Sequence, residues 1–193
     1  RNTMLNIVRK TAEEVFIPLT VGGGISSIQN IRSLLKAGAD KVSINSAAIQ
    51  NQQILQESSD HFGSQCIVVA VDVKKIENDW IVFSHGGTIN TNIIALKWLE
   101  KVQELGAGEI LLTSMDKDGT KSGFDIELLK VATNILQIPV IASGGVGAKE
   151  HFFEGVFEGG ASALLAASVF HFNEFSIKEV KQFLSDKNIK VRL

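Results

Sequence analysis

Asp72 is the residue whose setting in this sequence points most directly to chemistry. It ends an apolar run over residues 66–71, so a buried strand would deliver its carboxylate to the edge of a sheet. Partial burial raises the pKa of a carboxyl group and suits it to general acid or base catalysis. A helix cap or a structural salt bridge is the other interpretation, and the residue pattern favours neither.

Two glycine turns of similar sequence have the composition of phosphate-binding sites. They consist of Gly22, Gly23 and Gly24 in the first copy, and of Ser143, Gly144 and Gly145 in the second. Glycine lets a ligand approach bare backbone N–H groups, and the helix that follows adds partial positive charge. The two prolines of the chain, Pro18 and Pro139, hold the same place before both turns. Two such turns imply a ligand with a phosphate at each end.

Further polar residues follow other predicted strands and complete the candidate site. They are Asn45 and Ser46, Thr113 and Ser114, and Ala167 and Ser168. Asp116, Asp118 and Gly119 lie in a polar loop over residues 114–123. Asp-x-Asp-Gly also occurs in calcium loops, but the terminal Glu of that pattern is absent here. We therefore predict a loop that becomes ordered over a substrate.

The elements that must position these residues alternate between strand and helix. Strands are predicted near residues 17–21, 40–44, 66–72, 109–113, 139–142 and 161–165. Helices are predicted over residues 3–14, 28–35, 52–62, 93–105, 126–135, 150–157 and 177–185, with a short one opening at 167–170. Residues 74–92 are predicted to be irregular, with residues 80–83 as one arm of a surface hairpin. Such alternation means parallel strands joined by helical crossovers.

An internal repeat decides between a doubly wound sheet and a barrel. Residues 18–48 match residues 139–169 in the order strand, glycine turn, helix, glycine and short strand. Their offset is about half the ~250 residues of a typical (β/α)8 barrel. We predict an α/β fold of the (β/α)8 TIM barrel type with a half-barrel repeat. A general likeness among βα units is the alternative explanation.

The first residue, Arg1, stands at the start of a predicted helix that has no capping residue before it. Against a complete barrel, roughly the first two βα units are missing. We expect residues 1–193 to form a single barrel domain that is truncated at its N-terminus.

Composition argues against several other classes of function. With 45% apolar residues and a net charge of −2, the chain can bury one core, and neither a nucleic acid nor a membrane partner is predicted. No apolar run reaches the length of a membrane span, and no signal peptide is expected. A single cysteine cannot form an internal disulfide, which fits the reducing cytoplasm that we predict for this protein. Cys66, the single cysteine, is predicted to lie in a buried strand. The four scattered histidines are expected at the surface or at helix caps, and neither a metal nor a cofactor is predicted.

Five stretches resemble the cyclase subunit of imidazole glycerol phosphate synthase, and the resemblance covers nearly the whole chain. They are residues 20–25, 39–45, 111–120, 142–145 and 166–171. The resemblance implies a (β/α)8 barrel lyase of histidine biosynthesis that forms a heterodimer with a glutaminase, which supplies ammonia. The implied substrate is a ribulosyl-formimino-aminoimidazole carboxamide nucleotide carrying two phosphates. The implied products are imidazole glycerol phosphate and an aminoimidazole carboxamide ribotide.

The resemblance also implies a role for each candidate residue. Asp72 would be one of two catalytic aspartates and act as a general acid and base in ring closure. One phosphate is expected at Gly23, Gly24, Asn45 and Ser46, and the other at Gly119, Ser143, Gly144, Gly145, Ala167 and Ser168, with Thr113 and Asp118 lining the site. Asp40, Lys41, Gln65 and Glu109, at the opposite strand ends, are expected to meet the glutaminase and gate the passage of ammonia. A stabilising role is the alternative for this second group.

The family's other catalytic aspartate and a loop lysine would precede Arg1, in the part expected to be missing. Three other functions stay open: the sugar isomerase of the same pathway, a paralogue serving amidation in surface-polysaccharide synthesis, and a non-catalytic scaffold that binds the glutaminase. The loop over residues 116–120 and the charges at the opposite strand ends favour the cyclase over the isomerase.

Overall fold

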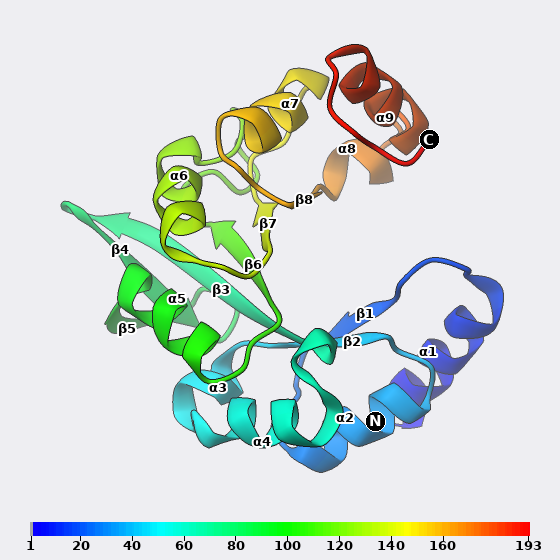
Figure 1. The fold of residues 1–193 in the computed structure, drawn as a ribbon, viewed down its shortest axis with the longest axis vertical. Helices are drawn as coiled ribbons and strands as arrows, with labels where there is room; N and C mark the ends of the chain where they lie inside the picture. Colours follow the sequence, from blue (N-terminus) through cyan, green and yellow to red (C-terminus); the bar gives the residue numbers. More distant parts are fainter. Residues whose placement is uncertain (1) are drawn as a thin grey trace.

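The computed structural model describes residues 2–193, which form one curved parallel sheet with helices outside it (Figure 1). The parallel strands are β1 (Thr20–Gly22), β2 (Lys41–Ile44), β3 (Ile67–Ile76), β6 (Glu109–Ser114), β7 (Val140–Ser143) and β8 (Ala163–Leu165). They pair in the order β1-β2-β3-β6-β7-β8, which follows the sequence without a reversal. A doubly wound sheet changes direction at a switch point, so this order fits a barrel instead.

The helices lie along an arc outside the strands, as Figure 1 shows. The long helices are α1 (Asn2–Glu14), α2 (Ile28–Lys36), α4 (Gln53–Phe62), α5 (Ala95–Glu104), α6 (Ile126–Ile135), α7 (Lys149–Phe157) and α9 (Ile177–Asp186). The short ones are α3 (Ser46–Gln50), η1 (Ser64–Cys66) and α8 (Ser168–His171). Because the crossovers cover one side of the sheet, the sheet curls as in a (β/α)8 barrel, and the predicted fold class is confirmed.

The hydrophobic core lies between the strands and these outer helices. In β2 and β6 every second residue is buried, namely Val42, Ile44, Ile110 and Leu112, and the residues between are mostly half-buried. A two-residue alternation is what strands covered on one face show. None of the helices within residues 2–193 is both long and apolar enough to cross a membrane.

The two halves of the predicted repeat have the same element order in space. β1, α2, β2 and α3 correspond to β7, α7, β8 and α8. After each first strand come two glycines with positive φ, 96° and 65° at Gly23 and Gly24 and 94° and 102° at Gly144 and Gly145. Glycine adopts this backbone without the steric penalty of a Cβ. The repeat therefore extends to the geometry of the turns.

The segment predicted to be irregular is ordered, and that prediction was wrong. β3 runs past Asp72 to Ile76 and continues into β4 (Asp79–Ser84) and β5 (Ile89–Ile94), which pair antiparallel. The predicted hairpin arm over residues 80–83 is confirmed as part of β4, but Trp80 and Ser84 are buried, so the arm does not lie at the surface. The alternation of buried and half-buried residues in β4 is the two-residue period of a strand with one face covered.

Several predicted boundaries also differ from the structure. β1 begins at Thr20 rather than at residue 17, because the N–H of Leu19 donates to the Asp40 carboxylate (2.7 Å) and Ile17 is exposed. Residues 93 and 94 belong to β5 rather than to the next helix, and β8 begins at Ala163. Cys66 lies in η1, partly exposed, and not in the strand. The short helix α3 was not predicted.

Candidate functional site

The carboxyl ends of neighbouring strands bring the central predicted residues together. Asp72 of β3 stands beside Thr113 of β6 in the strand register, and Thr113 stands beside Ser143 of β7. Asn45, which follows β2, donates a hydrogen bond from Nδ2 to Asp72 Oδ2 at 2.9 Å. Residues from four successive strands thus share one edge of the sheet, as a site at the C-terminal face of a barrel requires.

The carboxyl group of Asp72 has its pKa raised above the ordinary value of an aspartate. Burial is the largest cause, because a desolvated carboxylate is less stable in its charged form. Hydrogen bonds from Asn45 and Thr113 act in the opposite direction, and the negative charge of Asp118 raises the pKa further. A carboxyl group that is easier to protonate is better matched to proton transfer near neutral pH.

Asn45 holds a polar atom that is ready for a ligand. Its Nδ2 is engaged with Asp72, and its Oδ1 is buried with no hydrogen-bond partner among the described residues. A buried acceptor without a partner is costly, by about 1–3 kcal/mol. The remaining capacity of this side chain is to accept a hydrogen bond from a hydroxyl or N–H group. Phosphate binding by Asn45, as predicted, would fall to its backbone N–H.

The first glycine turn is open. A Cβ placed at Gly23 or Gly24 would meet no atom within 4 Å, so both backbone segments face free space. Met4 and Leu5 of α1 line a hollow together with these two glycines. The space suits a group that approaches the backbone closely, which agrees with the predicted phosphate site.

Ser46 is held by a contact that the sequence did not indicate. Its hydroxyl oxygen accepts a hydrogen bond from the backbone N–H of His85 at 2.9 Å. His85 follows β4 and has a positive φ of 54°, and its ring nitrogen Nδ1 lies 2.9 Å from Ser84 Oγ. The tip of the β4–β5 hairpin therefore rests against the candidate phosphate site at Ser46. Sequence reasoning missed this role of His85, because only one arm of the hairpin was predicted and it was expected to lie at the surface, away from the site.

The second glycine turn is packed against the loop over residues 114–123. A Cβ at Gly144 would lie 2.8 Å from the carbonyl oxygen of Ser114, and one at Gly145 would lie 2.1 Å from that of Gly123. Gly119 in the loop has a φ of 76° and open space at its Cβ position. The loop thus brings Asp118 and Gly119 to the second turn. Ala167 and Ser168 stand at the start of α8, after β8.

The four residues predicted at the opposite strand ends also come together. Asp40, Lys41, Gln65 and Glu109 line one hollow, and Lys41 Nζ forms an ion pair with Glu109 Oε1. Both side chains of the pair are about a quarter exposed, so the pair is less accessible to water than a typical surface ion pair. Their role toward a partner stays a prediction.

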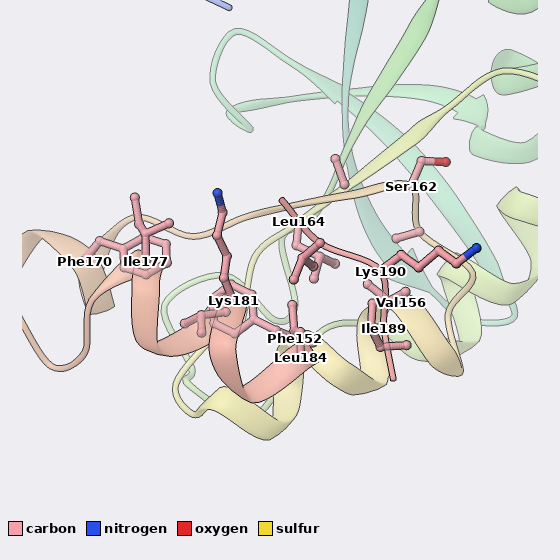
Figure 2. A pocket seen from close by; sticks show the side chains of 14 residues that line it. Phe152, Val156, Ser162, Leu164, Phe170, Ile177, Lys181, Leu184, Ile189 and Lys190 are labelled. Atoms are coloured by element: carbon pink, nitrogen blue, oxygen red, sulfur yellow. The ribbon is translucent and has the colours of Figure 1, made fainter. Parts of the chain in front are cut away.

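A separate, mainly apolar hollow lies between β8 and α9 (Figure 2). Phe152, Leu164, Phe170 and Leu184 form part of its wall, and no predicted site residue lines it. Within residues 2–193, no three His, Cys, Asp or Glu side chains come close enough to hold a metal ion. His151 caps a helix as predicted, since its Nδ1 accepts from the N–H groups of Gly147 and Ala148.

Comparison with known proteins agrees with this arrangement. The family model described as histidine biosynthesis protein matches residues 1–176. The chain is similar to imidazole glycerol phosphate synthase subunit HisF of Endomicrobium trichonymphae, with 60% identity over 193 residues, 100% of this chain and 74% of the relative. The protein of the same name from Hydrogenobaculum sp. (strain Y04AAS1) is 55% identical over 194 residues, 100% of this chain and 77% of the relative.

Proposed function

Since this chain belongs to the histidine biosynthesis protein family, we propose that it is the cyclase of imidazole glycerol phosphate synthase, a carbon–nitrogen lyase. The reaction joins ammonia to the ribulosyl-formimino-aminoimidazole carboxamide ribotide. It yields imidazole glycerol phosphate, aminoimidazole carboxamide ribotide and water. The observation that carries the proposal is the partly buried Asp72, held by Asn45 on the same edge of the sheet as the two glycine turns.

The substrate would lie across the C-terminal face with one phosphate at each glycine turn. Gly23, Gly24 and Ser46 would hold one phosphate, and Gly119 and the turn over residues 143–145 would hold the other, with Ala167 and Ser168. The repeat supports this assignment, because both turns place two successive glycines at positive φ. Thr113 and Asp118 would line the middle of the substrate, where the ring closes.

Asp72 would move the protons of ring closure. Ammonia loses protons as its nitrogen forms bonds to carbon, and the departing oxygen and amine groups must each gain one. A single carboxyl group can accept a proton in one step and return it in another. Its raised pKa supports this role, and the unpartnered Oδ1 of Asn45 supplies an acceptor for a substrate hydroxyl or N–H group.

Ammonia would come from a glutaminase subunit that docks at the opposite end of the strands. Asp40, Lys41, Gln65 and Glu109 line a common hollow there, which supports one shared interface. The Lys41–Glu109 ion pair would gate the path into the barrel. We further propose that residues 1–193 belong to one barrel domain, since the buried apolar side chains form one cluster, and that the enzyme works in the cytoplasm as a heterodimer.

The test is turnover of the two-phosphate nucleotide by the protein expressed from its own gene, with ammonium chloride as the nitrogen source. We expect ammonia-dependent loss of substrate, and a fall in kcat of about 10²–10⁴-fold in Asp72→Asn. Asp60→Asn is the matched control, because it makes the same chemical change on the exposed face of α4. Full activity in Asp72→Asn would exclude the proposed role of Asp72.

The same assay separates the other functions. Conversion of a pathway sugar phosphate without ammonia would indicate the isomerase. Ammonia-dependent amidation of a different sugar, with sugar-modifying genes as neighbours, would indicate the polysaccharide paralogue. Binding of the glutaminase without any turnover would indicate a scaffold.

A further inference from the structure

Besides Asp118, the loop over residues 114–123 contains a second aspartate, Asp116, which has no assigned role in the proposed reaction. β6 ends at Ser114, opposite Val73 of β3, and β3 continues to Ile76. The first loop residue still follows the ladder, because the N–H of Met115 donates to the carbonyl of Val73 at 2.8 Å. Beyond it, the chain leaves the sheet.

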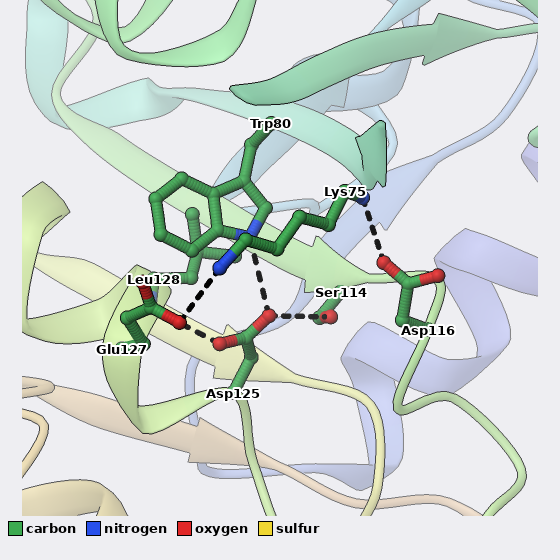
Figure 3. Close-up of polar contacts among 7 residues, drawn as sticks. All are labelled: Lys75, Trp80, Ser114, Asp116, Asp125, Glu127 and Leu128. Atoms are coloured by element: carbon green, nitrogen blue, oxygen red, sulfur yellow. Dashed lines mark hydrogen bonds and ion pairs between the residues drawn. The ribbon is translucent and has the colours of Figure 1, made fainter. Parts of the chain in front are cut away.

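Asp116 takes over the next hydrogen bond of β3. The N–H of Lys75 points to the same side of β3 as the groups of Val73, since strand residues repeat with a period of two. It donates to Asp116 Oδ2 at 2.7 Å, as Figure 3 shows. A side-chain carboxylate thus replaces the backbone acceptor that a longer β6 would have provided. A hydrogen bond to an ionised group is stronger than one between neutral groups, and more so where it is shielded from water.

The side chain of Lys75, in β3, also contacts residues of β4 and α6. The ammonium group of Lys75 lies 4.7 Å from the centre of the Trp80 ring and 2.8 Å from Glu127 Oε2. Trp80 is buried, and its Nε1 donates to Asp125 Oδ2 at 3.3 Å (Figure 3). These contacts join β3, through Lys75, to β4 and to the start of α6.

Asp125 connects the elements that surround Lys75. Its Oδ2 also accepts from Ser114 Oγ at 3.1 Å, and its Oδ1 accepts from the N–H of Leu128 at 3.1 Å, which caps α6. One carboxylate therefore links β4, the end of β6 and the start of α6. The loop is held at its first residue, Ser114, which we call the stem of the loop. It is held again at Asp116, whose hydrogen bond with Lys75 we call the tether.

Asp116 lies two residues before Asp118, whose negative charge raises the pKa of Asp72. The N–H of Asp118 donates to the carbonyl of Ser114 at 2.9 Å, and a Cβ on Gly144 would lie 3.3 Å from the Asp118 nitrogen. The backbone around Asp118 is thus placed by the loop stem, the tether and the second glycine turn. Without the hydrogen bond between Asp116 and Lys75, the segment from Met115 to Asp118 loses one of the contacts that hold it in place.

We infer that Asp116 is a positioning residue, whose carboxylate holds the loop so that Asp118 faces Asp72 across the candidate site. Its importance for turnover rests on the proposed function. The position of Asp118 relative to Asp72 does not, because it can be followed by the titration of Asp72 alone. A failure of the cyclase assay and a failure of this inference are therefore distinguishable.

The test is a 13C NMR titration of the Asp72 carboxyl group, assigned by its loss in Asp72→Asn. In Asp116→Ala we expect the pKa of Asp72 to shift downward, because the negative charge of Asp118 moves away. Asp118→Asn should shift it in the same direction by removing the charge. In the Asp118→Asn background, Asp116→Ala should add no further shift, since coupled residues are not additive. Asp116→Asn should keep most of the wild-type titration, because its amide oxygen still accepts from Lys75.

The matched control is Asp186→Ala on α9, which also removes an aspartate that accepts one hydrogen bond, from Gln182 Nε2 at 2.8 Å. It should leave the titration of Asp72 unchanged. An unchanged Asp72 titration in folded Asp116→Ala, or an equal shift in both backgrounds, would overturn the inference.

A measurement on the unaltered protein covers the case in which Asp116→Ala fails to fold. The amide hydrogen of Lys75 should exchange with solvent more slowly than a free amide, although Lys75 is an exposed residue. Exchange at the rate of a free amide would show that the tether is not formed.

Discussion

The side chain of Asn45, the residue after β2, donates a 2.9 Å hydrogen bond to Asp72 of the neighbouring parallel strand β3. This contact lowers the pKa of Asp72, whereas burial raises it by more. Asn45 thus adjusts the acidity of the proposed acid–base group and fixes its direction. The same amide presents its free Oδ1 to the site. The first prediction follows from this pair.

Asn45→Ala removes a donor to the charged form of Asp72, so the pKa of Asp72 should rise. The acidic limb of the pH profile of kcat/KM should move to higher pH, and kcat/KM at neutral pH should fall by about tenfold for a lost interaction of ~1.4 kcal/mol. Asn51→Ala, at the end of α3, is the control. An acidic limb at the wild-type position would show that the hydrogen bond is absent in solution.

Asp72→Asn should make the protein more stable at neutral pH while it loses activity. The pKa of Asp72 is higher in the folded state than the ordinary 3.8, so the folded protein binds this proton more tightly. Its contribution to stability is complete below the unfolded pKa and is lost as the pH rises through the folded pKa. Thermal melts at neutral pH should give a higher Tm for the variant, and the difference should shrink toward pH 3.8. A variant less stable than the wild type at neutral pH would contradict this.

The two glycine turns should respond differently to the same substitution. Gly24→Ala meets open space, so only the positive φ is penalised, by about 1–2 kcal/mol, and KM for the nucleotide should rise. Gly145→Ala should lose more stability, because its Cβ would overlap the carbonyl oxygen of Gly123 at 2.1 Å in addition to the strain at φ 102°. Urea unfolding of the two variants measures the difference. Equal losses would mean that the loop over residues 114–123 is not packed against the second turn.

Trp80→Phe should destabilise the protein by about 1 kcal/mol, because the hydrogen bond to Asp125 is lost while the ring is largely kept. For a chain of this size the Tm should fall by roughly 2–4 °C. Asp125→Ala should lose more, since it removes the cap of α6 and the bond from Ser114 as well. In a double-mutant cycle the two changes should not be additive. Full additivity would place Trp80 and Asp125 outside hydrogen-bond contact.

Lys41→Met should affect glutamine-dependent turnover more than turnover with added ammonium. The substitution breaks the ion pair with Glu109 at the proposed ammonia gate. Stability should change by less than about 1 kcal/mol, because the pair is partly exposed. Lys130→Met, which breaks the ion pair with Glu158, is the control. An equal loss with both nitrogen sources would remove Lys41 from the ammonia path.

Local patterns in the sequence were sufficient to predict the position of most strands of the parallel sheet. Apolar runs bounded by glycine and polar residues placed β2, β3, β6 and β7 within a few residues, because a strand covered by helices needs buried side chains at fixed spacing. Of the extension formed by β4 and β5, only the arm over residues 80–83 was predicted. Its strand period is interrupted by polar and glycine residues, and its stability depends on burying Trp80 against other elements.

The sequence by itself determined the order of the parallel strands and of the long helices, the two glycine turns and the strand that carries Asp72, although that strand runs on to Ile76 rather than ending at Asp72. These follow from local backbone preference and hydrophobic spacing, which act over a few residues. Only the tertiary structure decided that Asn45 bonds to Asp72, that His85 supports Ser46 and that Asp116 tethers the loop to Lys75. Those contacts join residues 27, 39 and 41 positions apart, so they depend on strand register and loop packing rather than on any local pattern.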